Sequence, residues 1–325
     1  MAQLDNRRYP KEVRAILAET GQNSPEAAIR QSAQSLIRQY TQLVSDDAPP
    51  FNMVALASLR SIRKTDDPPK FSKDAEIAPD GSGGMILRLN SERPRTRQRF
   101  SIGHEIGHTL FPGYKSTVHC RKGTDRDWSD PKDLIENLCD VAASEFLFPE
   151  PWFHDAAQSI AGEAAELLAL AQTYLASPEA TVRRFVEVRD DPEAVIFFRW
   201  KLKPSEHKRA DGKGQKHIFG SKSAFQPERK LRVEYSISNK AFDQLGIHIP
   251  AHKSVEEDCV ILQAARAGEC LNSTEDIDLG PLKGRYYIRV FPVFTADSDV
   301  GPNGERSVAA LISPAAKKRK RRQPR

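Results

Sequence analysis

The chain has 325 residues, of which 39% are hydrophobic and 29% charged, and its formal net charge is +5 at pH 7; this length is typical of two domains. No apolar run is long enough to span a membrane, and the first residues lack the apolar segment of a signal peptide, which argues against membrane and secreted classes. Four scattered cysteines without a C-x-x-C pair argue against a disulfide framework and indicate a reducing compartment, so we expect a cytoplasmic protein.

Residues 1–48 are predicted to form an N-terminal helical segment. A short helix should follow Pro10, and a longer one should begin with Ser24 as its N-cap and Pro25 as its first residue. Apolar residues then recur at spacings of three and four, which predicts one face packed on a core: Ile29, Ala33, Leu36, Tyr40 and Leu43. A proline-containing linker follows this helix.

The next segment leads from a strand into a helix. Residues 53–62 predict a short helix, and residues 85–90, which follow two turn-rich stretches, predict a strand. A helix is predicted over residues 100–111, where Pro112 stops it. The arginines between the strand and this helix are interpreted as a solvated face with at most one buried partner, rather than as a contact to substrate or nucleic acid: Arg93, Arg95, Arg97 and Arg99.

The helix over residues 100–111 contains one H-E-x-x-H motif. Positions i and i+4 of a helix lie one above the other, so His104 and His108 point the same way and can hold one zinc ion (Zn2+). Glu105 can then reach a water bound to that ion and act as the general base. The alternative interpretation is two ordinary histidines beside a glutamate that forms a salt bridge.

A second helical pattern, over residues 134–148, offers a further ligand. Glu136 and Asp140 are also i and i+4, so their carboxylates share a face. One of them can bind zinc, while the other accepts a hydrogen bond from the second ring nitrogen of a ligand histidine. The alternative is an acidic solvated stripe, to which we assign Glu145.

The two motifs together resemble the ImmA/IrrE family of zinc metallopeptidases over about residues 50–190. They read R-Q-R-F-S-I-G-H-E-I-G-H-T-L-F and I-E-N-L-C-D-V-A-A-S-E-F-L-F-P. The resemblance implies that His104, His108 and Glu136 bind the metal and that Glu105 is catalytic, which leaves Asp140, from its spacing, to support a ligand histidine. The chain departs from the usual second motif by placing Cys139, Asp140 and Ala142 where Ala, Asn and Phe are common.

A long polar loop is predicted between the two motifs, over residues 113–133. It contains Cys120, which would be a good zinc ligand as a thiolate. If the loop folds back, Cys120 can take the fourth zinc position and keep the enzyme inactive until a signal arrives. The simpler interpretation is an ordinary loop cysteine.

A smaller α+β domain is predicted after the helices over residues 164–174 and 178–188. Its expected strands and helices lie at 194–200, 231–237, 240–245, 259–265, 285–294 and 307–312. The resemblance implies a GAF-like sensor domain at this place. The chain then ends in seven Lys and Arg residues between Lys317 and Arg325, so the rest of it is slightly acidic. This tail should be disordered.

These observations predict an α+β protein with four segments: residues 1–48, a helical N-terminus; 49–189, a zinc peptidase domain; 190–313, a regulatory domain; and 314–325, a basic tail. The resemblance implies a zinc endopeptidase that cleaves a regulatory protein, often a helix-turn-helix repressor, and so switches on stress, phage-defence or mobile-element genes. Size and layout also resemble the phage-defence peptidases called CapP. Nucleic acid is expected as an activator or as a partner of the tail. The alternative is a DNA-binding regulator with a structural zinc site and no peptidase activity.

Overall fold

The structure is a computed structural model that describes residues 8–44, 48–65, 73–114, 119–120, 131–206, 228–292 and 304–315. The chain divides into two compact units. The first contains residues Met1–Ala156 and Ala169–Thr181, and the second contains Ala157–Leu168 and Val182–Arg325. In the part of the chain that is described, no helix is both long enough and apolar enough to cross a membrane. The predicted basic tail and most of the predicted loop between the motifs lie outside the described residues.

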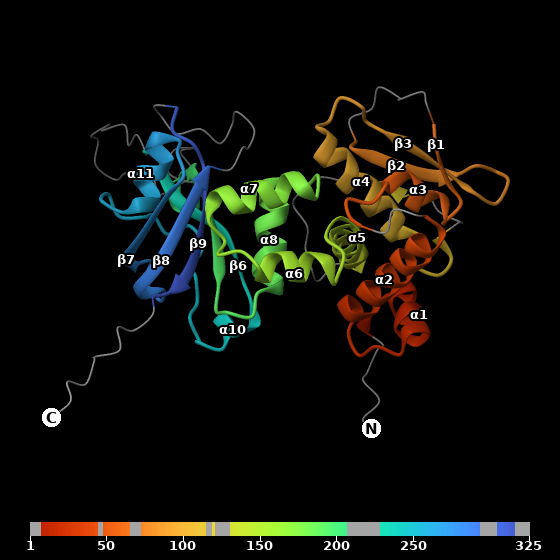
Figure 1. Cartoon of the computed structure of the whole chain (residues 1–325), viewed down its shortest axis with the longest axis horizontal. Coiled ribbons are helices and arrows are strands. Elements are labelled where there is room, and N and C mark those ends of the chain that lie inside the picture. Colours follow the sequence, from red (N-terminus) through yellow and green to blue (C-terminus); the bar gives the residue numbers. More distant parts are fainter. Residues whose placement is uncertain are drawn as a thin grey trace, which may run out of the picture. The chain divides into compact units, whose positions relative to one another are not determined.

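The first unit combines helices with a small sheet (Figure 1). Its main helices are α1 (Lys11–Thr20), α2 (Pro25–Leu43), α3 (Met53–Ser58), α4 (Arg95–His108), α5 (Pro131–Leu147) and α6 (Trp152–Gln158). Helix α5 packs against both α4 and α2, and α4 also contacts strands of the sheet. The expected N-cap of α2 is confirmed, because Ser24 Oγ accepts a hydrogen bond from the Ala27 amide.

The sheet of the first unit has the strand order β1-β3-β2-β4. Its strands are β1 (Ile62–Lys64), β2 (Ala75–Pro79), β3 (Met85–Leu89) and β4 (His119–Cys120). Strand β1 runs parallel to β3, whereas the other two pairs are antiparallel. Only β3 was expected from the sequence. The apolar residues Ile77, Met85 and Leu87 are buried and fix the inward face of the sheet.

Three expectations for the first unit are wrong in detail. The helix expected over residues 53–62 ends at Ser58, and Ile62 instead begins a strand. Leu43 is 72% exposed because it is the last residue of α2, beyond the buried face. Helix α4 begins at Arg95, five residues earlier than expected. Three of the four arginines therefore lie on this helix, and Arg97 pairs with Asp74.

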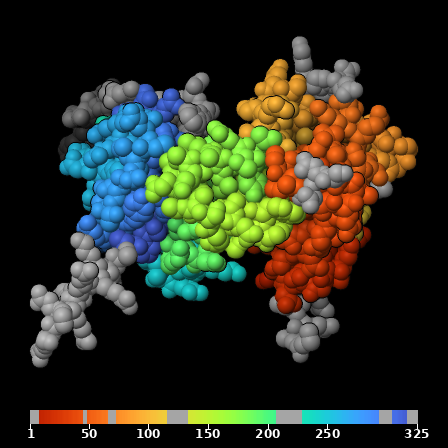
Figure 2. Space-filling model, in the orientation of Figure 1, coloured from red at the N-terminus to blue at the C-terminus, as the bar shows by residue number. Residues whose placement is uncertain are grey.

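The second unit is built on an antiparallel sheet with the strand order β6-β5-β9-β8-β7. The strands are β5 (Ala194–Lys201), β6 (Lys230–Ser238), β7 (Leu271–Asp278), β8 (Lys283–Pro292) and β9 (Val308–Pro314). Helix α11 (Val260–Ala267) packs on β7, β8 and β9, and α10 (Lys240–Asp243) follows β6. In Figure 2 the blue residues of this unit form one continuous surface. The mixed α+β class is confirmed; the GAF-like assignment stays a prediction.

Helices α7 (Ala164–Thr173) and α8 (Pro178–Val188) lie where the sequence predicts helices. The boundary between the compact units runs through both of them. Residues 157–168, which we expected in the peptidase domain, cluster with the second unit. Residues 157–168 belong with the second unit because a network of buried charged side chains binds their backbone.

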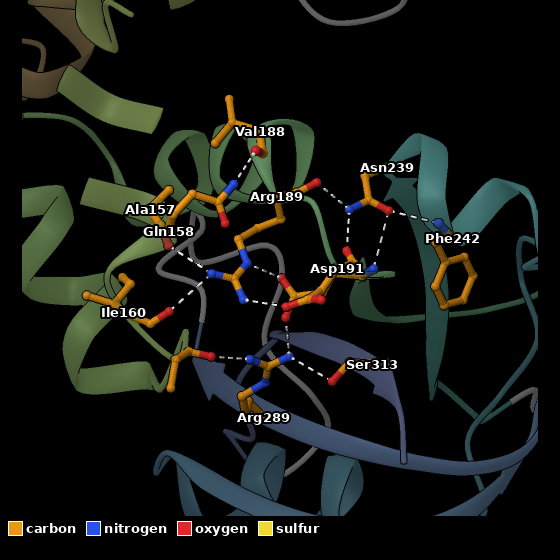
Figure 3. A network of polar contacts seen from close by, with 12 residues as sticks. Ala157, Gln158, Ile160, Val188, Arg189, Asp191, Asn239, Phe242, Arg289 and Ser313 are labelled. Carbon is orange, nitrogen blue, oxygen red and sulfur yellow. Dashed lines mark hydrogen bonds and ion pairs between the residues drawn. The ribbon is translucent and has the colours of Figure 1, made fainter. Parts of the chain in front are cut away.

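This network joins the segment before α7 to the sheet of the second unit (Figure 3). Arg289 on β8 donates hydrogen bonds to the carbonyl oxygen of Ala161 and to Glu193 Oε1, at 2.6 and 2.9 Å. Arg189 donates to the carbonyl oxygens of Ala157 and Ile160 and lies 3.5 Å from Glu193 Oε2. Burial raises the pKa of the Glu193 carboxyl, and the two arginines oppose this shift.

Candidate metal centre

Helices α4 and α5, which carry the two motifs, approach each other closely because α4 has glycines at positions 103 and 107. A Cβ atom on Gly107 would lie 3.0 Å from Cys139 Cα and 3.1 Å from its carbonyl oxygen. A Cβ atom on Gly103 would lie 3.2 Å from Ala143 Cα. The two glycines immediately precede His104 and His108, and the close approach of α5 brings Glu136 within 3.2 and 3.4 Å of these histidines.

We expect Gly107→Ala to weaken metal binding by moving α5 away from α4. Alanine favours the helix by about 1 kcal/mol relative to glycine, but overpacking against backbone atoms costs about 1–3 kcal/mol. Chelator competition measures the loss of metal affinity. Gly103→Ala is the matched control with a smaller effect, because a Cβ there would lie 3.2 Å from one backbone atom of α5, Ala143 Cα, whereas a Cβ on Gly107 would lie 3.0 and 3.1 Å from two. Equal affinity in the Gly107 variant and the parent would contradict this packing account.

Two histidine nitrogens and one carboxylate converge between these helices. His104 Nε2 lies 3.2 Å from Glu136 Oε2, and His108 Nε2 lies 3.4 Å from Glu136 Oε1. The two imidazole rings are 5.0 Å apart at their centroids. Both histidine side chains are essentially buried, and Glu136 is 22% exposed. The structure thus brings together the three residues expected to bind the metal.

Asp140 holds the other ring nitrogen of His104. Its Oδ1 lies 2.8 Å from His104 Nδ1. Burial lowers the pKa of His104, but hydrogen bonds to Asp140 and Glu136 outweigh it and raise this pKa to about 9. Because Nδ1 of His104 is hydrogen-bonded to the Asp140 carboxylate, the other ring nitrogen, Nε2, faces Glu136 and is the one that can bind a metal.

We expect Asp140→Ala to lower zinc affinity about 10- to 100-fold while the first unit stays folded. Asp140 is 34% exposed, so its removal leaves no large cavity. A chelator titration of the variant and the parent measures the affinity, and circular dichroism reports the helices. Asp140→Asn is the matched control, because an amide oxygen still accepts a hydrogen bond from Nδ1 and should restore part of the affinity. Unchanged zinc affinity in Asp140→Ala would show that Asp140 is only a charge on the surface and does not support the metal site.

Cys139 is the residue of this centre that sequence reasoning did not assign to it. Its side chain is buried, and its Sγ and one nitrogen from each of His104 and His108 all lie within 4.8 Å of one another. In the sequence, Cys139 stands out only as a departure from the usual second motif. The signal was present, because position 139 is i+3 from Glu136 and therefore lies on nearly the same face of the helix.

The remaining candidate residues have different surroundings. Glu105 is completely buried on α4, and its charge acts to raise the pKa of His104. Our assignment of Glu145 to a solvated stripe is wrong, because it is fully buried and pairs with Arg30 of α2. Cys120 lies in β4, where its backbone pairs with Glu76. The side chain of Cys120 lies outside the described residues, so its role as a ligand stays a prediction.

The donors present fit a zinc ion by their chemistry. Catalytic zinc sites use three protein ligands, most often imidazole nitrogens with a carboxylate oxygen, and keep a fourth position open. His104, His108 and Glu136 supply this set, and the carboxylate of Asp140 orients one of the imidazoles. The nearby thiol of Cys139 is also a donor that zinc accepts.

A family model and one known metalloprotease are similar to this part of the chain. Residues 64–186 match the Peptidase_M78 family, described as the IrrE N-terminal-like domain. The radiation response metalloprotease IrrE of Deinococcus radiodurans is 38% identical over 69 residues, which are 20% of this chain and 20% of that protein. A solved structure described as a Mycobacterium tuberculosis transcriptional regulator aligns with 93% of this chain and 80% of its own, at a TM-score of 0.48 and 13% identity. Residues 64–186 therefore belong to the ImmA/IrrE family of metallopeptidases, the family that the two motifs resemble.

Proposed function

We propose that this chain is a zinc-dependent endopeptidase that cleaves a specific regulatory protein. The observation that carries the proposal is that His104 Nε2 and His108 Nε2 lie 3.2 and 3.4 Å from the Glu136 carboxylate, on the helix that also holds the buried Glu105. The family of residues 64–186 and the resemblance to a metalloprotease support the same reading.

Each residue of the centre has a distinct part in peptide hydrolysis. His104, His108 and Glu136 would hold the zinc ion, which, when bound, supplies a Lewis acid that polarises the scissile carbonyl and activates water near neutral pH. Glu105 would take a proton from the attacking water and pass it to the leaving amine. Asp140 keeps Nε2 of His104 available by accepting the hydrogen of Nδ1.

Glu105 favours a peptidase over the alternative of a DNA-binding regulator with a structural zinc site. A structural site needs ligands but no general base, and structural zinc sites usually have four protein ligands. Here a fully buried carboxylate occupies the position next to His104, where a general base beside a metal ligand is expected.

The substrate class follows from the resemblance to the ImmA/IrrE family. We infer a helix-turn-helix repressor as the protein that is cut, and the release of stress or phage-defence genes as the result. The name of the relative IrrE, a radiation response metalloprotease, supports a stress response. The resemblance to the CapP peptidases supports a role in phage defence, with nucleic acid as the activating ligand.

The proposal is tested by incubating the zinc-loaded chain with a candidate helix-turn-helix repressor from the same organism and sequencing new N-termini by mass spectrometry. Parallel reactions with and without single-stranded DNA test whether cleavage requires a nucleic-acid activator. We expect one new terminus, lost when a chelator removes the metal and restored when zinc is added back. The absence of any zinc-dependent terminus under all of these conditions would contradict a peptidase acting on that repressor.

A further inference from the structure

We propose that strand β1 is a docking site for an extended, acidic segment of a partner protein. Strand β1 (Ile62–Lys64) forms one edge of the sheet of the first unit, and β4 forms the other edge. Helix α4, which carries the H-E-x-x-H motif, packs against β2, β3 and β4, whereas β1 packs against α3. The docking site is therefore separate from the metal centre, and the inference goes beyond the proposed function.

The backbone of β1 leaves two residues open for pairing with a further strand. The carbonyl oxygen of Ser61 accepts a hydrogen bond from the first residue of β3 at 2.9 Å, and the amide of Thr65 donates one to the third residue of β3 at 3.1 Å. In a parallel ladder alternate residues bond to the same neighbour, so the backbone groups of Arg63 also face β3. Those of Ile62 and Lys64 therefore point to the open edge, where no described residue forms a hydrogen bond with them.

The open groups of Ile62 and Lys64 match a peptide strand better than other ligands. Each residue offers one N–H donor and one C=O acceptor, and an added strand can bond to both. The phosphodiester backbone of a nucleic acid has acceptors but no donors for the two carbonyl groups. Antiparallel pairing with β1 of a second copy, in the register that uses both open residues, would place the two Arg63 side chains opposite each other, and like charges there are destabilising.

A pocket of about 760 Å³ lies along this edge strand. It is lined by the three residues of β1, by Val54 and Ser58 of α3, and by the turn that joins β2 to β3. Val54 is apolar and yet 36% exposed, so it offers a contact for an apolar side chain of the ligand. The open backbone groups thus lie beside a cavity that has room for the side chains of an added strand.

The charge of the pocket selects acidic side chains. Arg63 and Lys64 are both exposed, and in the described ranges neither of them is in a salt bridge. The carboxylate in the described lining belongs to Asp80, which accepts hydrogen bonds from the amides of Ser82 and Gly84 in its own turn, at 2.8 and 2.9 Å. Acidic side chains of a docked segment would therefore pair with Arg63 and Lys64.

A short edge strand with basic side chains can also serve only to prevent unwanted pairing, and peptide binding separates the two roles. The probes are two labelled peptides of alternating sequence, one of glutamate and valine and one of lysine and valine, titrated with the zinc-loaded chain by fluorescence anisotropy. We expect the acidic peptide to bind and the basic peptide not to bind. In nuclear magnetic resonance spectra the amide signals of Ile62 and Lys64 should shift most, because these amides gain hydrogen bonds, whereas the amide of Arg63 already has one.

Two substitutions of one residue separate charge from backbone pairing. Lys64→Ala removes the charge and should weaken binding of the acidic peptide about 3-fold. Lys64→Pro also removes the open N–H and should weaken binding about 10-fold or more. Proline is tolerated there because this N–H does not bond to β3. Arg88→Ala is the matched control, because it removes an exposed charge from β3 outside the pocket lining and should leave binding unchanged.

Several outcomes would overturn the proposal. No binding of the acidic peptide, or equal affinity in Lys64→Pro and Lys64→Ala, would refute strand addition at β1. A single-stranded DNA oligonucleotide that displaces the acidic peptide and binds more tightly would assign the pocket to nucleic acid. Dimerisation of the parent chain that is lost in Lys64→Pro would assign the edge to a second copy.

A further variant keeps the test if Lys64→Pro fails to fold. Val54→Glu adds a negative charge to the wall of the pocket, in the first turn of α3, where helices accept glutamate. It should weaken binding of the acidic peptide about 3-fold or more, and unchanged affinity would contradict the placement of the peptide in this pocket. All of these measurements are independent of zinc binding and cleavage, so their failure would leave the proposed function intact.

Discussion

Glu105→Gln should retain its zinc and lose peptide cleavage. The amide has the size of the carboxylate, so the helix that holds His104 and His108 is kept, while the group that accepts the proton is lost. Removal of a general base lowers rates about 10²- to 10⁴-fold. Metal analysis of the purified variant and single-turnover cleavage of the repressor measure the two properties separately.

The matched control for this variant is Glu92→Gln. Glu92 is exposed and precedes α4, so the same chemical change there should leave both zinc content and cleavage at parental values. A Glu105→Gln chain that cleaves at the parental rate would remove Glu105 from the catalytic assignment. A chain that has lost its zinc would show instead that Glu105 is needed to assemble the centre.

Arg289→Met should destabilise the second unit by about 3–5 kcal/mol, the usual cost of removing one partner from a buried ion pair. Arg289 and Glu193 are each only 3% exposed, so solvent does not screen their interaction. The variant also deprives Ala161 of the hydrogen bond that ties the segment before α7 to β8. Glu193 keeps only the longer contact to Arg189.

A chain of two units need not unfold in one step, so the stability of the second unit must be measured by itself. Urea unfolding followed by pulsed hydrogen exchange of peptides from β5 and β9 does this. Arg285→Met is the matched control on the same strand. Its side chain is 61% exposed and pairs with Asp276, which is 73% exposed, so we expect a change within about 1 kcal/mol. Equal urea midpoints for the two variants would show that the buried network contributes little.

Much of the helical framework could be predicted, because long amphipathic helices carry their own signals. The N-cap Ser24, the spacing of apolar residues in α2 and the i, i+4 spacing of His104 and His108 are all local. The helical pattern over residues 134–148 also predicts Glu136 and Asp140 on one face of α5. The contacts of both residues with His104 agree with that placement.

What could not be predicted depends on partners distant in the chain. Strands β1, β2 and β4 have only two to five residues, and they are stable only where a neighbour completes their hydrogen bonds. Glu145 is buried because Arg30, 115 residues away, lies beside it. The assignment of residues 157–168 to the second unit likewise follows from Arg189 and Arg289, whose contacts no local pattern reveals.

The most direct test of the zinc centre is an anomalous difference map, measured at the zinc absorption edge on crystals of the zinc-loaded chain. We predict one strong peak between α4 and α5, bonded to His104 Nε2, His108 Nε2 and the Glu136 carboxylate, with Asp140 against Nδ1 of His104. A peak held by other residues, or no peak between these two helices in crystals that contain zinc, would contradict the account.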